Sequence, residues 1–359
     1  MKNKKVYVIL IVLILIGCIF LTYNIYQNKN NISINKKRKQ NNLAIMIKED
    51  GATDYIKSNS KDIPKGDYTL NYEKSYCKNN GKIGDYDSSL GKVSFSFIGT
   101  DSCFLYFDYK EDTSLYGTIK KRAKTDTTYL ALYTGEGADT YAKPVYYYKG
   151  NVQNNNVSIN NLNFKIVRIN GDGSVRLALA NDTGELKKYV DSNEKYSYKD
   201  SVIKAYLDSW ITINLGDYTS FLATQKYCND VLLNDNTFYA YTRVVEDYIP
   251  SFICLSNKVT SKVALLTVDE VLFAGASPNE DNTSYYLYNE SIETDSFLMS
   301  SSKLVNGIYY PFALSKNGKV LSDVSGSFLR SVRPVITIIK TALVEGDGTS
   351  SNPYKLISN

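Results

Sequence analysis

An uncharged apolar run near the N-terminus limits most strongly how this chain can fold. Residues Val6–Tyr23 read VYVILIVLILIGCIFLTY, which is 18 residues without a charge. A helix of that length extends about 27 Å, at about 1.5 Å per residue, and can just cross a bilayer. With Asn24–Tyr26 reaching the interface, we expect residues 1–27 to form a membrane anchor.

The residues around this run indicate its orientation and leave other interpretations open. Lys2, Lys4 and Lys5 favour a cytoplasmic N-terminus, although the basic stretch Lys36–Lys39 weakens that preference. The segment LIGC, which ends at Cys18, resembles the lipobox of bacterial lipoproteins, so Cys18 is the alternative point of attachment through a lipid. An ordinary cleaved signal is a third interpretation. All three export the body, and we predict a single-pass protein of the cell membrane with an extracellular C-terminal body.

The distribution of charge excludes several functions. The chain has 42 Lys and Arg, 37 Asp and Glu and no His. Eight of the bases and none of the acids lie in residues 1–40, so the remainder holds 34 bases and 37 acids, a net charge of −3. Such a body does not attract phosphates, and nucleic acid is not an expected partner. Catalysis through an imidazole base is excluded, and we predict no cofactor and no metal site.

Four cysteines follow Cys18, and their even number in an exported chain predicts disulfide bonds. Three pairings are conceivable. We expect Cys77 to pair with Cys103 and Cys228 with Cys254, because each bridge then stabilises one domain, by about 3.5 kcal/mol in the chain-entropy model. A zinc site does not fit, since there is no CxxC and no His. Reduced, buried thiols are the remaining alternative.

Composition divides the chain further. Residues 28–42 are polar and rich in Asn and Lys, which is typical of a spacer. Residues 43–109 contain several short strand patterns, including the alternation of Val93, Phe95 and Phe97 with serines, and predict a small disulfide-clasped β-sandwich module. We interpret 110–144, with one strand pattern, as a connector.

Residues 145–359 combine strands with helices and predict an α+β, β-rich domain. The turn Asn170–Gly173 separates two apolar strands of a hairpin. An amphipathic helix is predicted to follow a cap at Asp200 or Ser201. A second helix is predicted to begin at the capping box formed by Thr267 and Glu270.

Six segments of this domain occur together in a recognisable order. They are YYYKGNVQNNNVSINNLNFKIVRINGDGSVRL, YSYKDSVIKAYLDSW, KVALLTVDEVLFAGA, SYYLYN, SVRPVITI and GDGTSSNPYKL. The chain thereby resembles an uncharacterised family of surface proteins from low-GC Gram-positive bacteria. The resemblance implies that residues 145–359 form a C-type-lectin-like domain, similar to formylglycine-generating enzymes. It implies no activity, because the calcium motifs of sugar-binding lectins are missing and Cys228 and Cys254 are interpreted as a structural bridge.

Other motifs have simpler structural interpretations. Ser201–Lys204 matches the SxxK motif of acyl-serine enzymes, but it is also explained as the start of a packed helix. Asn170, Asp172 and Ser174 match part of a calcium-binding loop, but they are also explained as a hairpin turn. The adjacent acids Asp269 and Glu270 fit the negative charge favoured at a helix start better than an acid and base pair.

A tyrosine-rich stretch is the candidate ligand-binding site. Tyr285, Tyr286 and Tyr288 are either strand residues facing the core or part of a recognition surface, with neighbouring loops in residues 277–306. We therefore predict a non-catalytic, membrane-anchored extracellular protein whose lectin-like domain binds a protein or a glycan. A cell-envelope enzyme with His-free chemistry and a purely structural surface component are the alternatives.

Overall fold

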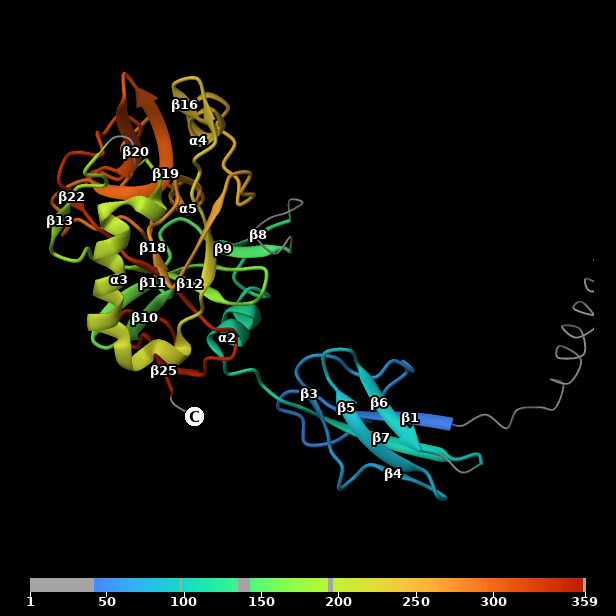
Figure 1. Cartoon of the computed structure of the whole chain (residues 1–359). Helices are drawn as coiled ribbons and strands as arrows, with labels where there is room; N and C mark the ends of the chain where they lie inside the picture. Colours follow the sequence, from blue (N-terminus) through green and yellow to red (C-terminus); the bar gives the residue numbers. More distant parts are fainter. Residues whose placement is uncertain (1–41, 97–98, 135–142, 193–195, 358–359) are drawn as a thin grey trace, which may run out of the picture. The chain divides into compact units, whose positions relative to one another are not determined.

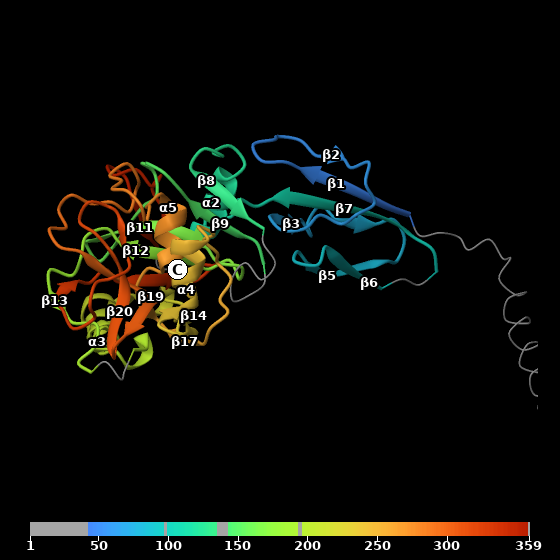
Figure 2. The same ribbon diagram turned by 90° about the horizontal axis from the view of Figure 1, so that it is seen from above.

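The computed structural model describes residues 42–96, 99–134, 143–192 and 196–357 (Figure 1, Figure 2). These residues form two compact units, with the boundary between Glu111 and Asp112. Within the described ranges, no helix is long and apolar enough to cross a bilayer. The predicted anchor and the spacer up to residue 41 lie outside the described residues.

The first unit is built on a five-stranded sheet around β7 (Ser102–Tyr109). The other strands of this sheet are β1 (Asn42–Lys48), β2 (Ile56–Lys57), β3 (Tyr68–Leu70) and β4 (Tyr76–Cys77). β1 runs parallel to β7 and pairs with β2 at its outer side, while β3 and β4 pair antiparallel with β7. Because strand side chains alternate between faces, β7 buries Cys103, Leu105 and Phe107 on one side.

A two-stranded hairpin forms the second layer of this unit. It consists of β5 (Lys82–Asp87) and β6 (Lys92–Ser96), paired antiparallel. Val93 and Phe95 pack against the core around Leu105 and Phe107, and the residues between them are exposed. The alternation predicted from the sequence is confirmed for these two residues, whereas Phe97 lies outside the described residues. The unit thus consists of two β layers, the five-stranded sheet and this hairpin.

A disulfide bond joins Cys77 to Cys103 within this unit. The two residues face each other in the register of β4 and β7, with their Cα atoms 4.0 Å apart. The buried core of the unit is small and consists of four buried apolar side chains, at Ile45, Leu70, Leu105 and Phe107. The cross-link therefore adds stability where burial alone supplies little.

The second unit contains a nine-stranded sheet. Its strands are β8 (Leu130–Tyr133), β9 (Val145–Tyr148), β10 (Asn156–Ile159), β11 (Leu162–Ile169), β12 (Val175–Leu179), β18 (Val263–Ala264), β23 (Val335–Ile338), β24 (Val344–Glu345) and β25 (Tyr354–Leu356). The order is β18, β23, β12, β11, β10, β25 and β24, with β9 beside the C-terminal half of β11 and β8 beyond β9. All five residues of β12 are buried, so both faces of the sheet are covered there. β10 and the terminal strand β25 run parallel, which brings the two ends of the domain together.

Residues 112–134 belong to the second unit, although residues 110–144 were predicted to be a connector. They contain α2 (Leu115–Arg122) and β8, which pairs antiparallel with β9. Leu115, Ile119 and Leu130 are buried in the core of the second unit. The helix was missed because its apolar side, spaced by four residues, is short and surrounded by lysines.

Two further helices match the sequence patterns. α3 (Val202–Leu215) begins at Ser201, whose hydroxyl accepts a hydrogen bond from the amide of Lys204, and it is in contact with β18 (Figure 1). α5 (Val268–Ala274) begins with the predicted capping box, in which Thr267 and Glu270 bind each other's backbone amides. Shorter helical turns are η1 (Tyr198–Asp200), η2 (Gly216–Phe221), α4 (Tyr239–Tyr241) and the π-helical η3 (Thr242–Glu246).

A seven-stranded sheet and a separate hairpin complete the unit. The sheet contains β13 (Leu186–Lys187), β15 (Leu233–Asn234), β16 (Thr237–Phe238), β19 (Ser296–Val305), β20 (Ile308–Leu314), β21 (Val320–Leu321) and β22 (Arg330–Ser331). The hairpin pairs β14 (Gln225–Cys228) with β17 (Lys258–Ser261). The segment between β14 and β17 contains β15, β16, α4 and η3. This segment carries the candidate site.

Candidate functional site

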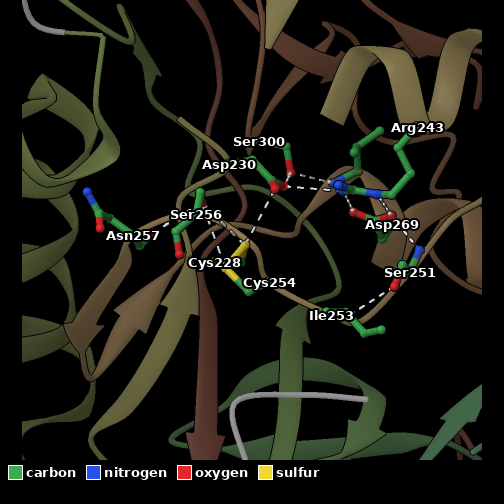
Figure 3. The surroundings of a disulfide bond; sticks show 11 residues. Cys228, Asp230, Arg243, Ser251, Ile253, Cys254, Ser256, Asn257, Asp269 and Ser300 are labelled. Carbon is green, nitrogen blue, oxygen red and sulfur yellow. Dashed lines mark hydrogen bonds and ion pairs between the residues drawn. A yellow bond between two sulfur atoms is a disulfide. The ribbon is translucent and has the colours of Figure 1, made fainter. Parts of the chain in front are cut away.

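A disulfide bond between Cys228 and Cys254 closes the segment between β14 and β17 (Figure 3). Its Cα atoms are 5.5 Å apart. Cys228 is the last residue of β14 and pairs in register with Lys258 of β17. The bridge and the strand pair together hold the two ends of residues 229–253, which we call the Cys228–Cys254 loop. The predicted pairing of the cysteines is confirmed.

Arg243 anchors the middle of this loop in the protein interior. Its Nε lies 3.0 Å from Asp269 Oδ1 and its Nη2 lies 2.5 Å from Asp269 Oδ2, an ion pair in which both side chains are buried. The same Nη2 lies 3.6 Å from Oδ2 of Asp230, which accepts a hydrogen bond from the Ser300 hydroxyl at 2.8 Å. Figure 3 shows these groups converging beside the disulfide. The amide of Ser251, near the end of the loop, also donates to Asp269 Oδ1 at 2.7 Å.

Burial and charge shift the proton affinities of this cluster. Burial raises the pKa of Asp269 to about 6 against the attraction of Arg243, and repulsion from Asp230 adds to the increase. Burial also disfavours the charged form of Arg243, but attraction by Asp269 and Asp230 outweighs it and raises the Arg243 pKa above its usual value. The guanidinium is thus a permanent charge held by two acids.

A second buried ion cluster lies next to the first. Oε1 of Glu270 binds Arg168 Nε at 3.0 Å and Arg176 Nη1 at 2.5 Å, while Oε2 accepts the Thr267 amide. Burial alone would raise the pKa of Glu270, yet the two arginines and the backbone amide lower it below its usual value. Arg168 also stacks on Phe252 of the loop, 4.8 Å from the ring centre. The loop therefore rests on the sheet through Arg168 and on α5 through Asp269.

The outward side of the loop exposes large apolar side chains. Ile249 is 63% exposed, Tyr248 58% and Leu232 49%. Leu233 and Tyr239 are also exposed. The amide of Tyr239 donates to the carbonyl of Leu232, and the amide of Ile249 donates to the carbonyl of Arg243, so these side chains are carried on a hydrogen-bonded backbone. Rigid apolar groups on an exposed loop are the usual chemistry of a recognition surface.

Tyr248 adopts a backbone conformation that bulky residues rarely occupy. Its φ is +58°, in the left-handed region. Such a conformation costs about 1–3 kcal/mol and persists only where the surroundings impose it. Here the residues on both sides of Tyr248 are held. The amide of Asp247 donates to the carbonyl of Thr242, and the amide of Ile249 donates to the carbonyl of Arg243. An exposed aromatic residue is thereby kept in a fixed orientation at the expense of backbone strain.

The cavity beneath the loop is small. It has room of about 20 Å³ and is lined by Arg168, Arg176, Asp230, Arg243 and Asp269. A cavity of this size holds about one water molecule. The buried cluster therefore supports the loop rather than accommodating a substrate in this conformation.

The tyrosines proposed as a recognition surface are in a different environment. Tyr285 is 2% exposed and Tyr286 is 5% exposed, and only Tyr288 is half-buried. The Tyr285 hydroxyl donates to the carbonyl of Gly318 at 3.1 Å, and the Tyr286 amide donates to the carbonyl of Gly150. The hypothesis of an exposed Tyr285 and Tyr286 surface is therefore wrong.

The neighbouring stretch is also internal. Within residues 277–306, β19 buries its first seven residues. Arg333 is 2% exposed and donates to the carbonyls of Leu179, Ala180 and Leu287. These contacts hold three segments together.

The remaining motifs have structural roles. Lys204 Nζ binds Asp208 at 2.5 Å, and the Ser201 hydroxyl donates to the carbonyl of Tyr198. The serine and the lysine of the SxxK motif therefore bind other partners and not each other. Asp172 holds the turn by accepting hydrogen bonds from Ser174 and Gln225. Within the described ranges, no group of three or more His, Cys, Asp or Glu side chains is arranged to hold a metal.

The Cys228–Cys254 loop was not recognised as a site from the sequence. Its anchor, Arg243, lies 26 residues from Asp269, and no local pattern links the two. One signal was available, because Leu232, Leu233, Tyr248 and Ile249 are large apolar residues in a segment without helical or strand periodicity. Comparison with protein-family models, with curated proteins and with solved structures finds no match to this chain.

Proposed function

We propose that this chain is a membrane-anchored extracellular protein that binds a protein partner through the Cys228–Cys254 loop. The observation that carries the proposal is the combination of exposed Leu232, Leu233, Tyr239, Tyr248 and Ile249 with a closed and buried framework. A loop that is ordered before binding loses little conformational entropy when it docks. Aromatic and aliphatic anchors of this kind supply most of the affinity in protein interfaces.

The proposal extends the expected architecture. We place the loop on a C-type-lectin-like domain, in which long loops supported by the terminal strands form the binding face. The parallel pairing of β10 with β25 and the length of the segment between β14 and β17 support this assignment. The first unit and the residues before it would then act as a spacer between the membrane and the binding domain.

Site-specific crosslinking on intact cells tests the binding site. A photoreactive amino acid placed at position 233 or 249 of the full chain should yield a discrete crosslinked species. The matched control is position 213, because Ile213 is an 80% exposed apolar residue on α3, outside the loop. A crosslink of equal yield at position 213, or none at 233 and 249, would contradict the proposal.

The membrane topology of the chain is tested by a separate experiment. Protease added to intact cells should remove residues 43–359 if the body is extracellular. Replacement Cys18→Ala should leave the protein in the membrane if residues 1–27 are an uncleaved anchor. Release of the Cys18→Ala protein would identify the lipoprotein alternative, and protection of the body from protease would refute export.

A further inference from the structure

The exposed charges of the Cys228–Cys254 loop are all negative. Residues 229–253 contain a single base, Arg243, which is buried between Asp269 and Asp230. The exposed charged residues of the loop are Asp235, Glu246 and Asp247. The loop's own exposed side chains are therefore apolar groups and carboxylates, and the nearby Lys303 of β19 lies against Tyr241, 4.6 Å from the ring centre.

These acids lie beside the apolar side chains. Asp235 occupies the turn between β15 and β16, two residues after the exposed Leu233. Glu246 and Asp247 end η3 and directly precede Tyr248 and Ile249. At each of these two places, apolar and acidic residues are therefore neighbours in sequence.

We propose that the Cys228–Cys254 loop binds a protein surface whose apolar centre is bordered by lysine and arginine side chains. This inference rests on the proposed function and defines the chemistry of its partner. The apolar contacts supply affinity, and opposite charges at the rim raise the association rate and select the partner. Anionic lipids and anionic wall polymers would meet like charge at the same place.

A second copy of this chain is a poor occupant on the same grounds. In a two-fold dimer the same surface faces itself, so Glu246 and Asp247 of one copy would approach the acids of the other. Like charges facing each other across an interface oppose association. The charge pattern therefore favours a different, basic protein.

Synthetic peptides provide a direct probe of this chemistry. The full chain in phosphatidylcholine nanodiscs is titrated with three fluorescent helical peptides: an amphipathic Leu/Lys peptide, its Leu/Glu counterpart and a Ser/Lys peptide. Empty nanodiscs correct for binding to lipid. The Leu/Lys peptide should bind at least about tenfold more tightly than either of the others, a difference of about 1.4 kcal/mol, and added salt should weaken its binding.

Charge variants separate the rim from the rest of the protein. The double variant Glu246→Lys, Asp247→Lys should reverse the preference between the Leu/Lys and Leu/Glu peptides. Asp217→Lys, a charge reversal at an exposed residue of η2, should leave the preference unchanged. Asp235→Asn is a milder variant, because asparagine is compatible with the left-handed φ of +53° at this turn. It should weaken binding of the Leu/Lys peptide and leave binding of the other two peptides unchanged.

Several outcomes would overturn the inference. Equal binding of the Leu/Lys peptide to wild type, the double variant and Asp235→Asn would show that the acids do not select the partner. Tighter binding of the Leu/Glu peptide to wild type would indicate an acidic partner. A concentration-dependent dimer that Ile249→Ser abolishes would identify a second copy as the occupant. In each case crosslinking from positions 233 and 249 still decides separately whether the loop binds a protein.

Discussion

Arg243 and Asp269 form a buried ion pair that joins the Cys228–Cys254 loop to the first turn of α5. Two hydrogen bonds, of 3.0 Å and 2.5 Å, link the guanidinium to both carboxylate oxygens. Tyr248 and Ile249 are exposed, and the Ile249 amide donates a hydrogen bond to the carbonyl of Arg243. The side chain of Arg243 therefore neutralises Asp269, while the backbone carbonyl of the same residue holds Ile249, one of the residues proposed to contact the partner.

Removal of Arg243 should destabilise the second unit strongly. Arg243→Ala leaves Asp269 and Asp230 buried without their cation, and such a change costs about 3–5 kcal/mol. The double variant Arg243→Met, Asp269→Leu should cost much less, because no charge remains unpaired. Fluorescence of Trp210, the single tryptophan and a residue of α3, reports unfolding of this unit. Lys204→Ala, which breaks the partly exposed pair with Asp208, should cost less than about 1 kcal/mol, and an equal loss in both single variants would contradict the role given to Arg243.

Asp269 should make the second unit less stable as pH rises from about 4 to about 6. Burial raises its folded pKa to about 6, above the ordinary value of 3.8, so the folded state holds the proton over this range while the unfolded state has lost it. The free energy of unfolding therefore falls with pH in this window and levels off above it. Asp269→Asn should flatten this part of the profile. An unchanged slope in Asp269→Asn would show that another group is responsible.

Local sequence patterns predicted the parts of the fold that local physics determines. The cap at Ser201, the capping box of Thr267 and Glu270, the turn at Asn170–Gly173 and both disulfides are confirmed. In each of these the residues that interact are close in sequence, or are the only suitable partners in their domain. Segments whose stability depends on distant strands are less predictable, as α2 and β8 show, because their apolar residues are buried against the core of the second unit.

The candidate site could not be predicted because its geometry depends on tertiary contacts. Asp269 was interpreted as helix-start charge, which agrees with its place in α5, but the sequence does not indicate that it would bind Arg243. Tyr285 and Tyr286 follow polar residues and resemble a surface stretch, yet the Tyr285 hydroxyl donates to the carbonyl of Gly318 and the Tyr286 backbone amide donates to the carbonyl of Gly150. Both of these partners are distant in sequence, so the burial of the two tyrosines is set by the fold.

Arg333 should be irreplaceable even by lysine. Its guanidinium donates to the carbonyls of Leu179, Ala180 and Leu287, and a lysine ammonium cannot reproduce this planar arrangement. Arg333→Met should leave these buried carbonyls with fewer donors, at a cost of about 1–3 kcal/mol for each group that loses its partner. Arg333→Lys should fall between Arg333→Met and wild type in denaturant unfolding followed by Trp210. If Arg333→Met unfolded at the same denaturant concentration as wild type, the carbonyls of Leu179, Ala180 and Leu287 would have to find other donors.

Tyr248→Gly should separate binding from stability. Glycine adopts a positive φ without strain, so the relief at this position should offset the loss of the side chain, and unfolding should change by less than about 0.5 kcal/mol. Crosslinking from position 249 should nevertheless decrease, since an aromatic contact is lost. Tyr239→Gly is the matched control, because it removes an exposed tyrosine from the helical turn α4 and should cost about 1 kcal/mol. Equal destabilisation by both changes would argue against strain at Tyr248.

Substitutions in the tyrosine stretch should now affect stability in the order of burial. Tyr285→Ser removes a side chain that is 2% exposed and should cost about 3–5 kcal/mol, as other large truncations in a core do. Tyr285→Phe keeps the ring and loses only the hydrogen bond to Gly318, at a cost of about 1 kcal/mol. Tyr288→Ser, at a half-buried position, should cost clearly less than Tyr285→Ser. All three should leave crosslinking from position 249 intact under conditions where the variant remains folded, because these tyrosines lie outside the Cys228–Cys254 loop. If a folded Tyr288→Ser protein lost the crosslink with no change in its unfolding midpoint, Tyr288 would have to be part of the binding surface.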